Sequence, residues 1–328
     1  MREVCPLPVK VEPARGESGL GFLLRAARAN GLSLASLLDG LGLPKSPRQT
    51  MQGFAALARA TEVDLELLVS WTVVAVRRDG YCCAEWQGHL WTCPLSLRAA
   101  RPQVCPECLR EGQPCLLEWE LTGAVACLRH HRPLVDACVH CGRRLSWWRP
   151  AIDVCACGHF LSADPAAVTV DDGMLGWIAK LVTETCGTAP AHADAMPGLP
   201  RWLNVLSPDG LVAVAFAFGI RNAPLERVTS AAATVPPLTL RMAEVVQRGV
   251  ARLQRTAELR EQCPADLRML VYEEGLQRLW RRGATDADRD AAAGLLAWLG
   301  ATPRRARSAA RLYGGGQGEL FASEGAYE

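Results

Sequence analysis

The chain has 328 residues, of which 49% are hydrophobic, and a formal net charge of +2. This length allows two or three domains with ordinary hydrophobic cores. The nearly neutral charge argues against a protein whose whole surface binds nucleic acid, so any basic surface is expected to be local.

No segment indicates export or membrane insertion. The N-terminal residues lack the apolar core of a secretory signal peptide. The longest apolar run, residues 211–218, is far shorter than the roughly 20 residues of a membrane helix. We therefore expect a soluble, cytoplasmic bacterial protein with no membrane partner. Thiols stay reduced in the cytoplasm, so clusters among the 14 cysteines favour metal binding over disulfides.

The first 75 residues are expected to form a helical, helix-turn-helix-like module (residues 1–75). Apolar side chains occur at helical spacing over residues 17–42, where Gly31 is placed to end one helix and Ser33 to open the next. The helical pattern continues over residues 53–72. The core residues expected in this later segment are Leu57, Val63, Leu67, Leu68 and Trp71.

The next segment, residues 76–165, is expected to be a tandem zinc-ribbon or zinc-finger region. It begins with a less regular, aromatic-rich stretch over residues 76–104 and continues into a cysteine-rich stretch. Short strands are expected over residues 116–126.

The C-terminal half is predicted to be helical, which makes the chain mainly α. The pattern predicts a helix over 171–185 and a linker rich in Pro, Gly and Ala over 186–200. Further helices are expected over 239–260, 265–282 and 286–299. The expected divisions are a C-terminal helical domain at 166–300 and a polar tail at 301–328.

Two sets of cysteine and histidine residues have the spacing of tetrahedral zinc sites. The first reads CPEC followed by CLRH, and the second reads CVHC followed by CAC. In each set a loop brings two close pairs together. The predicted ligands are Cys105, Cys108, Cys127 and His130 for one ion, and Cys138, Cys141, Cys155 and Cys157 for the other.

Other histidines compete for these sites. His131 and His140 are alternative nitrogen donors for the first ion, although the CxxH spacing favours His130. His159 competes with Cys157 for the second ion, where the CxC pair followed by glycine favours the cysteine.

Both quartets are complete in protein ligands, which leaves no position on the ion for water or substrate. The expected cofactors are therefore two structural Zn2+ ions, each replacing hydrophobic core in a short segment. The sequence also has no P-loop, GxSxG elbow or HExxH motif. We expect no enzymatic activity and no catalytic residues.

The other cysteines fit no ligand pattern. Cys82, Cys83 and Cys93, with His89 nearby, are candidates for a third site, but their poor spacing favours buried or free thiols. Cys115 lies inside the first zinc loop and is expected to be a spectator.

Two groups of arginines are candidates for a surface that binds nucleic acid or a partner protein. The group in the second zinc loop mixes basic and aromatic side chains, which suits a DNA or RNA backbone or a protein. The second group forms a stripe on the helix at 239–260, where a solvated face is the alternative explanation. The residues are Arg143, Arg144, Trp147, Trp148 and Arg149 in the loop, and Arg241, Arg248, Arg252 and Arg255 on the helix.

A motif in the helical opening, followed by the two quartets in this order, carries a resemblance to a known family. The opening contains Gly16-Glu17-Ser18, Leu20, Leu23, Arg25, Ala27 and Asn30-Gly31. CPxC, CxxHxxxL, CxxCG and CxCG follow at residues 105–108, 127–134, 138–142 and 155–158. In order and spacing, residues 5–165 resemble the TniQ/TnsD family of transposon target-selection proteins.

The resemblance implies an adaptor in DNA transposition. Such a protein couples a target-recognition complex to an AAA+ ATPase regulator and, through it, to the transposase. The recognition complex is an RNA-guided Cascade-type complex in CRISPR-associated transposons and other site-selecting machinery elsewhere. Some members are homodimers, so a homodimer is expected. The chain looks like the shorter, TniQ-type members, which favours adaptor behaviour over direct reading of an attachment site.

The competing hypothesis is a stand-alone zinc-containing transcription regulator that reads DNA through a helix-turn-helix. The nearly neutral charge counts against it, because much of a protein's affinity for DNA comes from neutralised phosphates. A zinc-dependent enzyme is the third hypothesis, which the closed quartets disfavour.

Overall fold

The computed structural model describes residues 4–46, 51–93, 95–162, 170–187, 199–229, 237–256 and 263–304. Over these residues the protein is mainly helical with short antiparallel strands, as the sequence predicts. Contacts divide the chain into two compact units, each built from segments that are separate in sequence. The N-terminal unit combines residues 1–74 with 98–169, and the C-terminal unit combines residues 75–97 with 170–323.

The division into four segments expected from the sequence stays a prediction about domains. In the structure, residues 75–97 group with the C-terminal helices rather than with the cysteine-rich segment that follows them.

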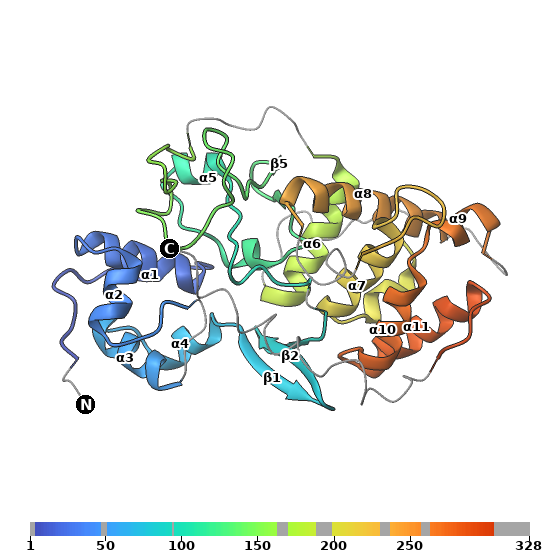
Figure 1. Ribbon diagram of the computed structural model, residues 1–328, viewed down its shortest axis with the longest axis horizontal. Coiled ribbons are helices and arrows are strands. Elements are labelled where there is room, and N and C mark those ends of the chain that lie inside the picture. Colours follow the sequence, from blue (N-terminus) through green and yellow to red (C-terminus); the bar gives the residue numbers. More distant parts are fainter. Residues whose placement is uncertain are drawn as a thin grey trace. The chain divides into compact units, whose positions relative to one another are not determined.

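Four helices open the N-terminal unit (Figure 1). They are α1 (Gly19–Ala29), α2 (Leu34–Gly40), α3 (Met51–Thr61) and α4 (Leu65–Ser70). The Ser18 hydroxyl accepts a hydrogen bond from the first turn of α1, and Ser33 caps α2 in the same way. Between them Gly31 has a φ of +70°, which glycine adopts without steric cost. The predicted helix, tight turn and helix are confirmed.

The core of this helical module contains most of the residues expected. Leu57 and Leu68 are buried, together with Val63 and Trp71, but Leu67 is 39% exposed. Successive residues of a helix point about 100° apart, so Leu67 and Leu68 cannot both face the core.

Backbone pairing ties the start of α1 to the first zinc loop. The amide of Ser18 donates to the carbonyl of Cys115, and the amide of Leu117 donates to the carbonyl of Gly16, both at 2.8 Å. Glu17, between them, is completely buried. Its carboxylate accepts two 2.6 Å hydrogen bonds from the guanidinium of Arg25, which satisfies the buried charge.

The strands predicted over residues 116–126 are mostly absent. Leu117–Glu120 forms the 3-10 helix η1, and the strand β4 is only Ala126–Cys127, paired with β5 (Arg132–Pro133). In η1 the amide of Trp119 donates to the carbonyl of Leu116, so the backbone is satisfied locally. Leu117 and Trp119 are buried, but so is Glu120, so the alternation of apolar and acidic residues does not separate a buried face from an exposed one as it would in a strand.

The C-terminal unit begins with a sheet over residues that were expected to be irregular. Its strands are β1 (Val74–Arg78), β2 (Tyr81–Trp86) and β3 (His89–Trp91), in the order β1-β2-β3. Two-residue turns at Asp79-Gly80 and Gln87-Gly88 have positive φ at both positions, which matches the twist of the flanking strands.

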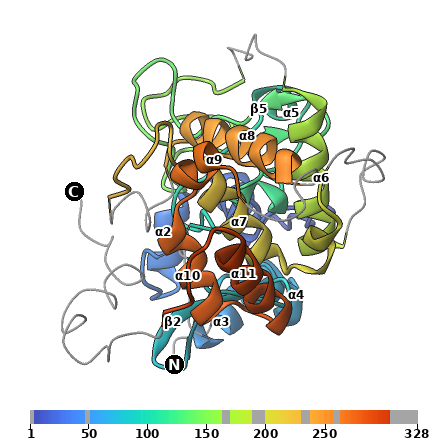
Figure 2. The same ribbon diagram turned by 90° about the vertical axis from the view of Figure 1, so that its right-hand side faces the viewer.

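Helix α7 (Pro208–Gly219) is the centre of the C-terminal unit (Figure 2). It contacts α6 (Asp172–Cys186), α8 (Thr239–Thr256), α10 (Glu273–Arg282) and β3. Nearly all of its residues are buried, so its sequence is apolar all round and has no helical periodicity. No helix within the described residues has both the length and the apolar character needed to cross a membrane.

The predicted C-terminal helices are confirmed with one break. The helix expected over 171–185 is α6, and the last predicted helix is α11 (Asp286–Trp298). Of the helix expected over 239–260, residues 239–256 form α8 and residues 257–260 lie outside the described residues. The helix expected over 265–282 is divided into α9 (Ala265–Leu270) and α10.

The break between α9 and α10 has a local cause. Val271 is extended, and the amide of Tyr272 donates to the carbonyl of Ala217 on α7 at 2.8 Å instead of continuing α9. Of the expected linker and tail, residues 188–198 and 305–328 lie outside the described residues.

Asp209, in the first turn of α7, fastens the loop after β3 to that helix. Its buried carboxylate accepts hydrogen bonds from the Thr92 amide at 2.8 Å, the Thr92 hydroxyl at 2.6 Å, the Cys93 amide at 3.2 Å and the Ser96 hydroxyl at 2.7 Å. Burial raises the pKa of Asp209, while these hydrogen bonds act in the opposite direction. The sheet and α7 are therefore joined through one side chain.

The close packing of α7 against α8 generates a stability prediction. A Cβ added at Gly249 would overlap the carbonyl of Ala215. We expect Gly249→Ala to lower the free energy of unfolding by about 1–3 kcal/mol, the usual cost of overpacking, as measured by urea unfolding.

Gly294→Ala is the matched control, because a Cβ at Gly294 in α11 meets nothing within 4 Å. It should be neutral or stabilising by up to about 1 kcal/mol, since alanine favours helix over glycine. Equal unfolding midpoints for the two variants would contradict the packing described.

Candidate metal centres

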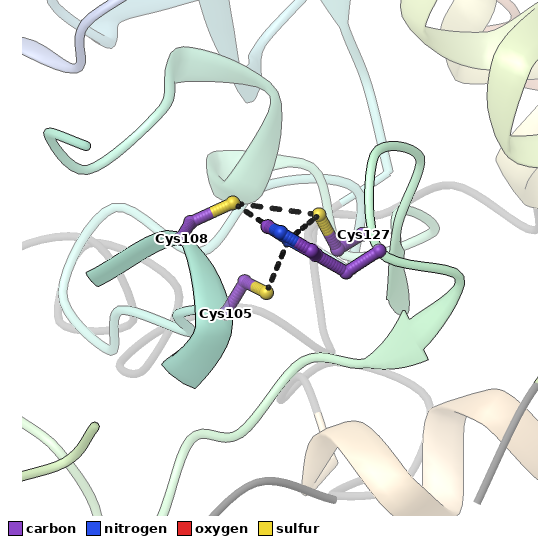
Figure 3. A group of neighbouring side chains, drawn as sticks. Cys105, Cys108 and Cys127 are labelled. Carbon is purple, nitrogen blue, oxygen red and sulfur yellow. Dashed lines mark hydrogen bonds between the residues drawn. The ribbon is translucent and has the colours of Figure 1, made fainter. Parts of the chain in front are cut away.

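The first quartet is assembled from two short elements (Figure 3). Cys105 precedes α5 (Pro106–Arg110), which carries Cys108 one turn later, and Cys127 lies in β4. The Nδ1 atom of His130 lies 3.5 Å from the Sγ of Cys105, 3.3 Å from that of Cys108 and 3.6 Å from that of Cys127. The Sγ atoms of Cys108 and Cys127 are 3.6 Å apart. All three cysteines are buried.

These distances fit a tetrahedral zinc ion. Zn–S bonds of about 2.3 Å at tetrahedral angles place two sulfur atoms about 3.8 Å apart, and a Zn–N bond of about 2.1 Å places nitrogen and sulfur about 3.6 Å apart. The separations are far longer than a disulfide bond of about 2.0 Å. The four donors therefore suit one Zn2+, which would hold α5 and the β4–β5 turn together.

Glu111 completes the surroundings of the first quartet. Its Oε1 lies 2.9 Å from the Nε2 of His130, and its Oε2 lies 2.9 Å from Arg129. A carboxylate on the far nitrogen of a metal-binding histidine fixes the ring and its tautomer. Sequence reasoning missed Glu111, because an acidic residue shortly after a CxxC pair is too common to be a signal.

The second quartet lies within a loop-rich stretch. The Sγ atoms of Cys138 and Cys157 are 3.8 Å apart, as are those of Cys141 and Cys155. The four Sγ atoms all lie within 4.8 Å of one another. These separations again match the sulfur edges of a zinc tetrahedron.

The rival histidines lie outside both donor groups. The ring of His159 stacks on that of His140, with centroids 5.2 Å apart and an interplanar angle of 11°. The structure therefore brings Cys157 rather than His159 to the second group, and His130 rather than His131 or His140 to the first.

The protonation of the thiols links metal binding to pH. Hydrogen bonds with Cys105 and Cys127, together with burial, raise the pKa of the Cys108 thiol. The same contacts lower the pKa of Cys127, whose thiolate accepts from the two neighbouring thiols. Zinc has to displace the protons of these thiols, so its affinity is expected to fall as the pH falls.

The two quartets are the metal-type clusters found within the described residues. Cys82, Cys83 and Cys93 do not form a third one with His89. Cys115 is buried and accepts from Arg149 at 3.6 Å, so it has a packing contact rather than a ligand position.

The arginine and tryptophan group of the second zinc loop is only partly on the surface. Trp147 and Arg149 are buried, because the Trp147 indole donates to a backbone carbonyl and Arg149 donates to the carbonyls of Ser146, Ala151 and Ile152. These two residues therefore do not contribute to the predicted surface.

The other members of this group have mixed positions. Arg144 pairs with Asp136 at 3.1 Å. Arg143 and Trp148 are exposed, and a hydrogen bond with Cys141 raises the pKa of Arg143. Arg143 and Trp148 are thus exposed and Arg144 is half-buried, and the surface predicted in this loop stays a prediction.

The arginine stripe on α8 is largely occupied by contacts within the C-terminal unit. Arg248 donates to the carbonyl of Gly219, and Arg252 donates to that of Phe218, at the end of α7. Cations at a helix C-terminus are favourable, which explains these two residues. The remaining two arginines of the stripe form ion pairs with carboxylates, Arg241 with Glu244 and Arg255 with Asp266.

The closed quartets predict a zinc content that can be measured. We expect metal analysis of the purified chain to give two zinc ions per chain, and Cys108→Ser to reduce this to one and to lower the melting temperature. Cys82→Ser is the control and should keep both ions. A count of three, or full zinc content and an unchanged melting temperature in Cys108→Ser, would contradict the assignment.

The contact between Glu111 and His130 predicts a change in metal retention. Glu111→Gln removes the charge that orients the ring, so zinc should be lost to a chelator at a roughly 10–100-fold lower concentration, the usual effect of a lost outer partner. The measurement is chelator competition with a colorimetric zinc indicator. Glu66→Gln is the control, because Glu66 is an exposed acidic residue of α4 outside both quartets, and equal retention in both variants would refute the role of Glu111.

Comparison with protein families agrees with these features. The model of the TniQ family matches residues 8–134, a span that contains α1 to α4, the sheet and the first quartet. No curated protein gives a significant match to the chain. TniQ is a family of non-enzymatic adaptors, and its domain supports a general role in target selection for transposition. Over residues 8–134, the chain is therefore similar to the TniQ family.

Proposed function

We propose that this protein is a target-selection adaptor in DNA transposition. It couples a target-recognition complex to an AAA+ ATPase regulator and, through the ATPase, to the transposase. The recognition complex is either an RNA-guided Cascade-type complex or another site-recognition protein. The TniQ match over residues 8–134 is the observation that carries the proposal.

The contacts of the family motif support this proposal physically. The residues at the start of α1 pair with the first zinc loop, and Glu17, which is buried at that junction, forms an ion pair with the half-buried Arg25. An adaptor has to hold its binding surfaces in a fixed relation. The zinc ions and this junction would do so within the N-terminal unit.

The ligand sets support a protein without catalysis. Each quartet supplies four protein donors, so a bound zinc ion would have no open position at which to activate water or substrate. On this proposal the two ions are structural and the protein acts through its surfaces.

We further propose that the adaptor is a cytoplasmic homodimer, as in some members of the family. Light scattering on the purified zinc-loaded chain measures this directly. A mass equal to one chain at micromolar concentration would contradict the dimer without affecting the adaptor role.

The decisive experiment is a pull-down with the AAA+ ATPase encoded in the same genetic element. The immobilised chain should retain the ATPase, and Cys108→Ser should lose it because the first zinc site organises the TniQ domain. Cys5→Ser is the control, since that exposed thiol is outside both quartets.

The competing transcription regulator makes the opposite prediction. It would bind a specific DNA duplex alone, would not retain the ATPase, and would be encoded away from ATPase and transposase genes. That combination of results would refute the adaptor proposal.

A further inference from the structure

An arginine cluster forms where the β1–β2 hairpin meets α10, with Arg78, Arg281 and Arg304 exposed and Arg282 half-buried. The guanidinium of Arg282, in the last turn of α10, lies 3.6 Å from the centre of the Tyr81 ring at the start of β2. The two-residue turn at Asp79-Gly80 places Arg78 opposite Tyr81, on the same face of the hairpin. Arg282 therefore covers the Tyr81 ring, and Arg78 lies on the same face of the hairpin as Tyr81.

The neighbouring residue Cys83 supports this arrangement. It is two positions after Tyr81 on β2 and so shares its face. Burial and the negative charge of Asp209 raise the pKa of Cys83, and the positive charges of Arg282 and Arg78 both act in the opposite direction. Both guanidinium groups are therefore close to this face.

The cluster continues along the end of α10. The Arg281 side chain donates to the carbonyl of Arg304 at 3.2 Å. The amide of Arg304 in turn donates to the side chain of Gln277 at 2.9 Å. The hydrogen bond between the Arg281 side chain and the Arg304 carbonyl places these two residues side by side, and both are exposed. We define the Arg–Tyr surface as Arg78, Tyr81, Arg281, Arg282 and Arg304.

Within the described residues neither Arg78 nor Arg282 forms an ion pair with a carboxylate. Near the end of α10, Asp286 pairs with Arg289, and Glu274, at the other end of the helix, pairs with Arg221. Two further acids lie near the hairpin. Asp79 is in the turn next to Arg78, and Asp209 is buried and accepts hydrogen bonds from the loop after β3.

The helix dipole alone does not explain the cluster. Arginines in the last turn of a helix are favourable, which would account for Arg281 and Arg282. It accounts for neither Arg78, which comes from the hairpin, nor Arg304, which follows α11.

We propose that the Arg–Tyr surface binds the phosphodiester backbone of a nucleic acid. Arginine suits this ligand because its planar guanidinium donates several hydrogen bonds to phosphate oxygens. The face of Tyr81 that Arg282 covers is closed to a base, so contact occurs through phosphates and does not depend on sequence. Binding through one local surface is also compatible with the small net charge of +2.

A nucleic acid fits this surface better than an acidic protein segment. The guanidinium groups come from three separate segments, the hairpin, α10 and the residues after α11, and so spread over an extended surface. A backbone offers regularly repeated phosphates that such a surface can contact at several points. The proposal goes beyond the adaptor role and does not depend on ATPase binding.

The test is fluorescence anisotropy of the full zinc-loaded chain with a mixed-sequence DNA duplex and with an RNA of the same length, over a series of salt concentrations. Replacing Arg78 and Arg282 together by alanine should weaken binding by roughly tenfold. It should also reduce the slope of log K against log salt by about 2, because each phosphate contact contributes about 0.9. Stronger binding of one probe identifies the nucleic acid.

Two single variants serve as controls. Arg77→Ala removes an equal charge from the other face of β1 and should leave the slope unchanged. Arg282→Lys keeps a cation over Tyr81 and should retain most of the binding. The proposal is overturned if neither probe binds the wild-type chain, if the double variant binds both like wild type with an unchanged melting temperature, or if only an acidic peptide responds to it.

Discussion

The structure of the N-terminal unit depends on the pairing of residues 16–18 with residues 115–117. On one side of this pairing Ser18 caps α1, and on the other side lies the loop that closes the first quartet. Cys115 also contacts Gly21, where a Cβ would lie only 2.8 Å from the Cys115 side chain. The backbones of the helical module and the zinc loop are therefore in direct contact.

The same segment extends the connection to the second quartet. Cys115 accepts from Arg149, whose other donors bind carbonyls of the second zinc loop. None of these hydrogen bonds of Arg149 is to a carboxylate. Its buried charge is stabilised by backbone carbonyls and by the Trp147 ring, whose centroid lies 5.3 Å from the guanidinium carbon. One short segment thus joins the helical module and both zinc sites.

The features that the sequence predicted are those with a local physical cause. A CxxC pair places two sulfur atoms on one turn, and a serine before a helix caps it, whatever the rest of the fold. That is why both quartets and the turn at Gly31 could be recognised. The burial of Trp147 and Arg149 could not be predicted, because a basic and aromatic loop has the same composition on a surface and in a core.

The features that were missed depend on partners distant in sequence. Helix α7 is buried on nearly all sides, so its apolar run lacks the periodicity that marks a helix. The hairpin did have a local signal in its Asp79-Gly80 turn. Its assignment to the C-terminal unit depends on Asp209, more than a hundred residues later, and no pattern in either segment indicates that contact.

The anchoring of the β3 loop by Asp209 bears on how this protein can be divided. The family match ends at residue 134, yet residues 75–97 inside it belong to the unit that contains α7. A fragment cut at the end of the match would leave the amides of Thr92 and Cys93 without their carboxylate. It would also remove α7, which contacts β3, the strand that carries the buried Trp91. The TniQ segment of this chain is therefore a unit of sequence similarity but not an autonomous unit of folding.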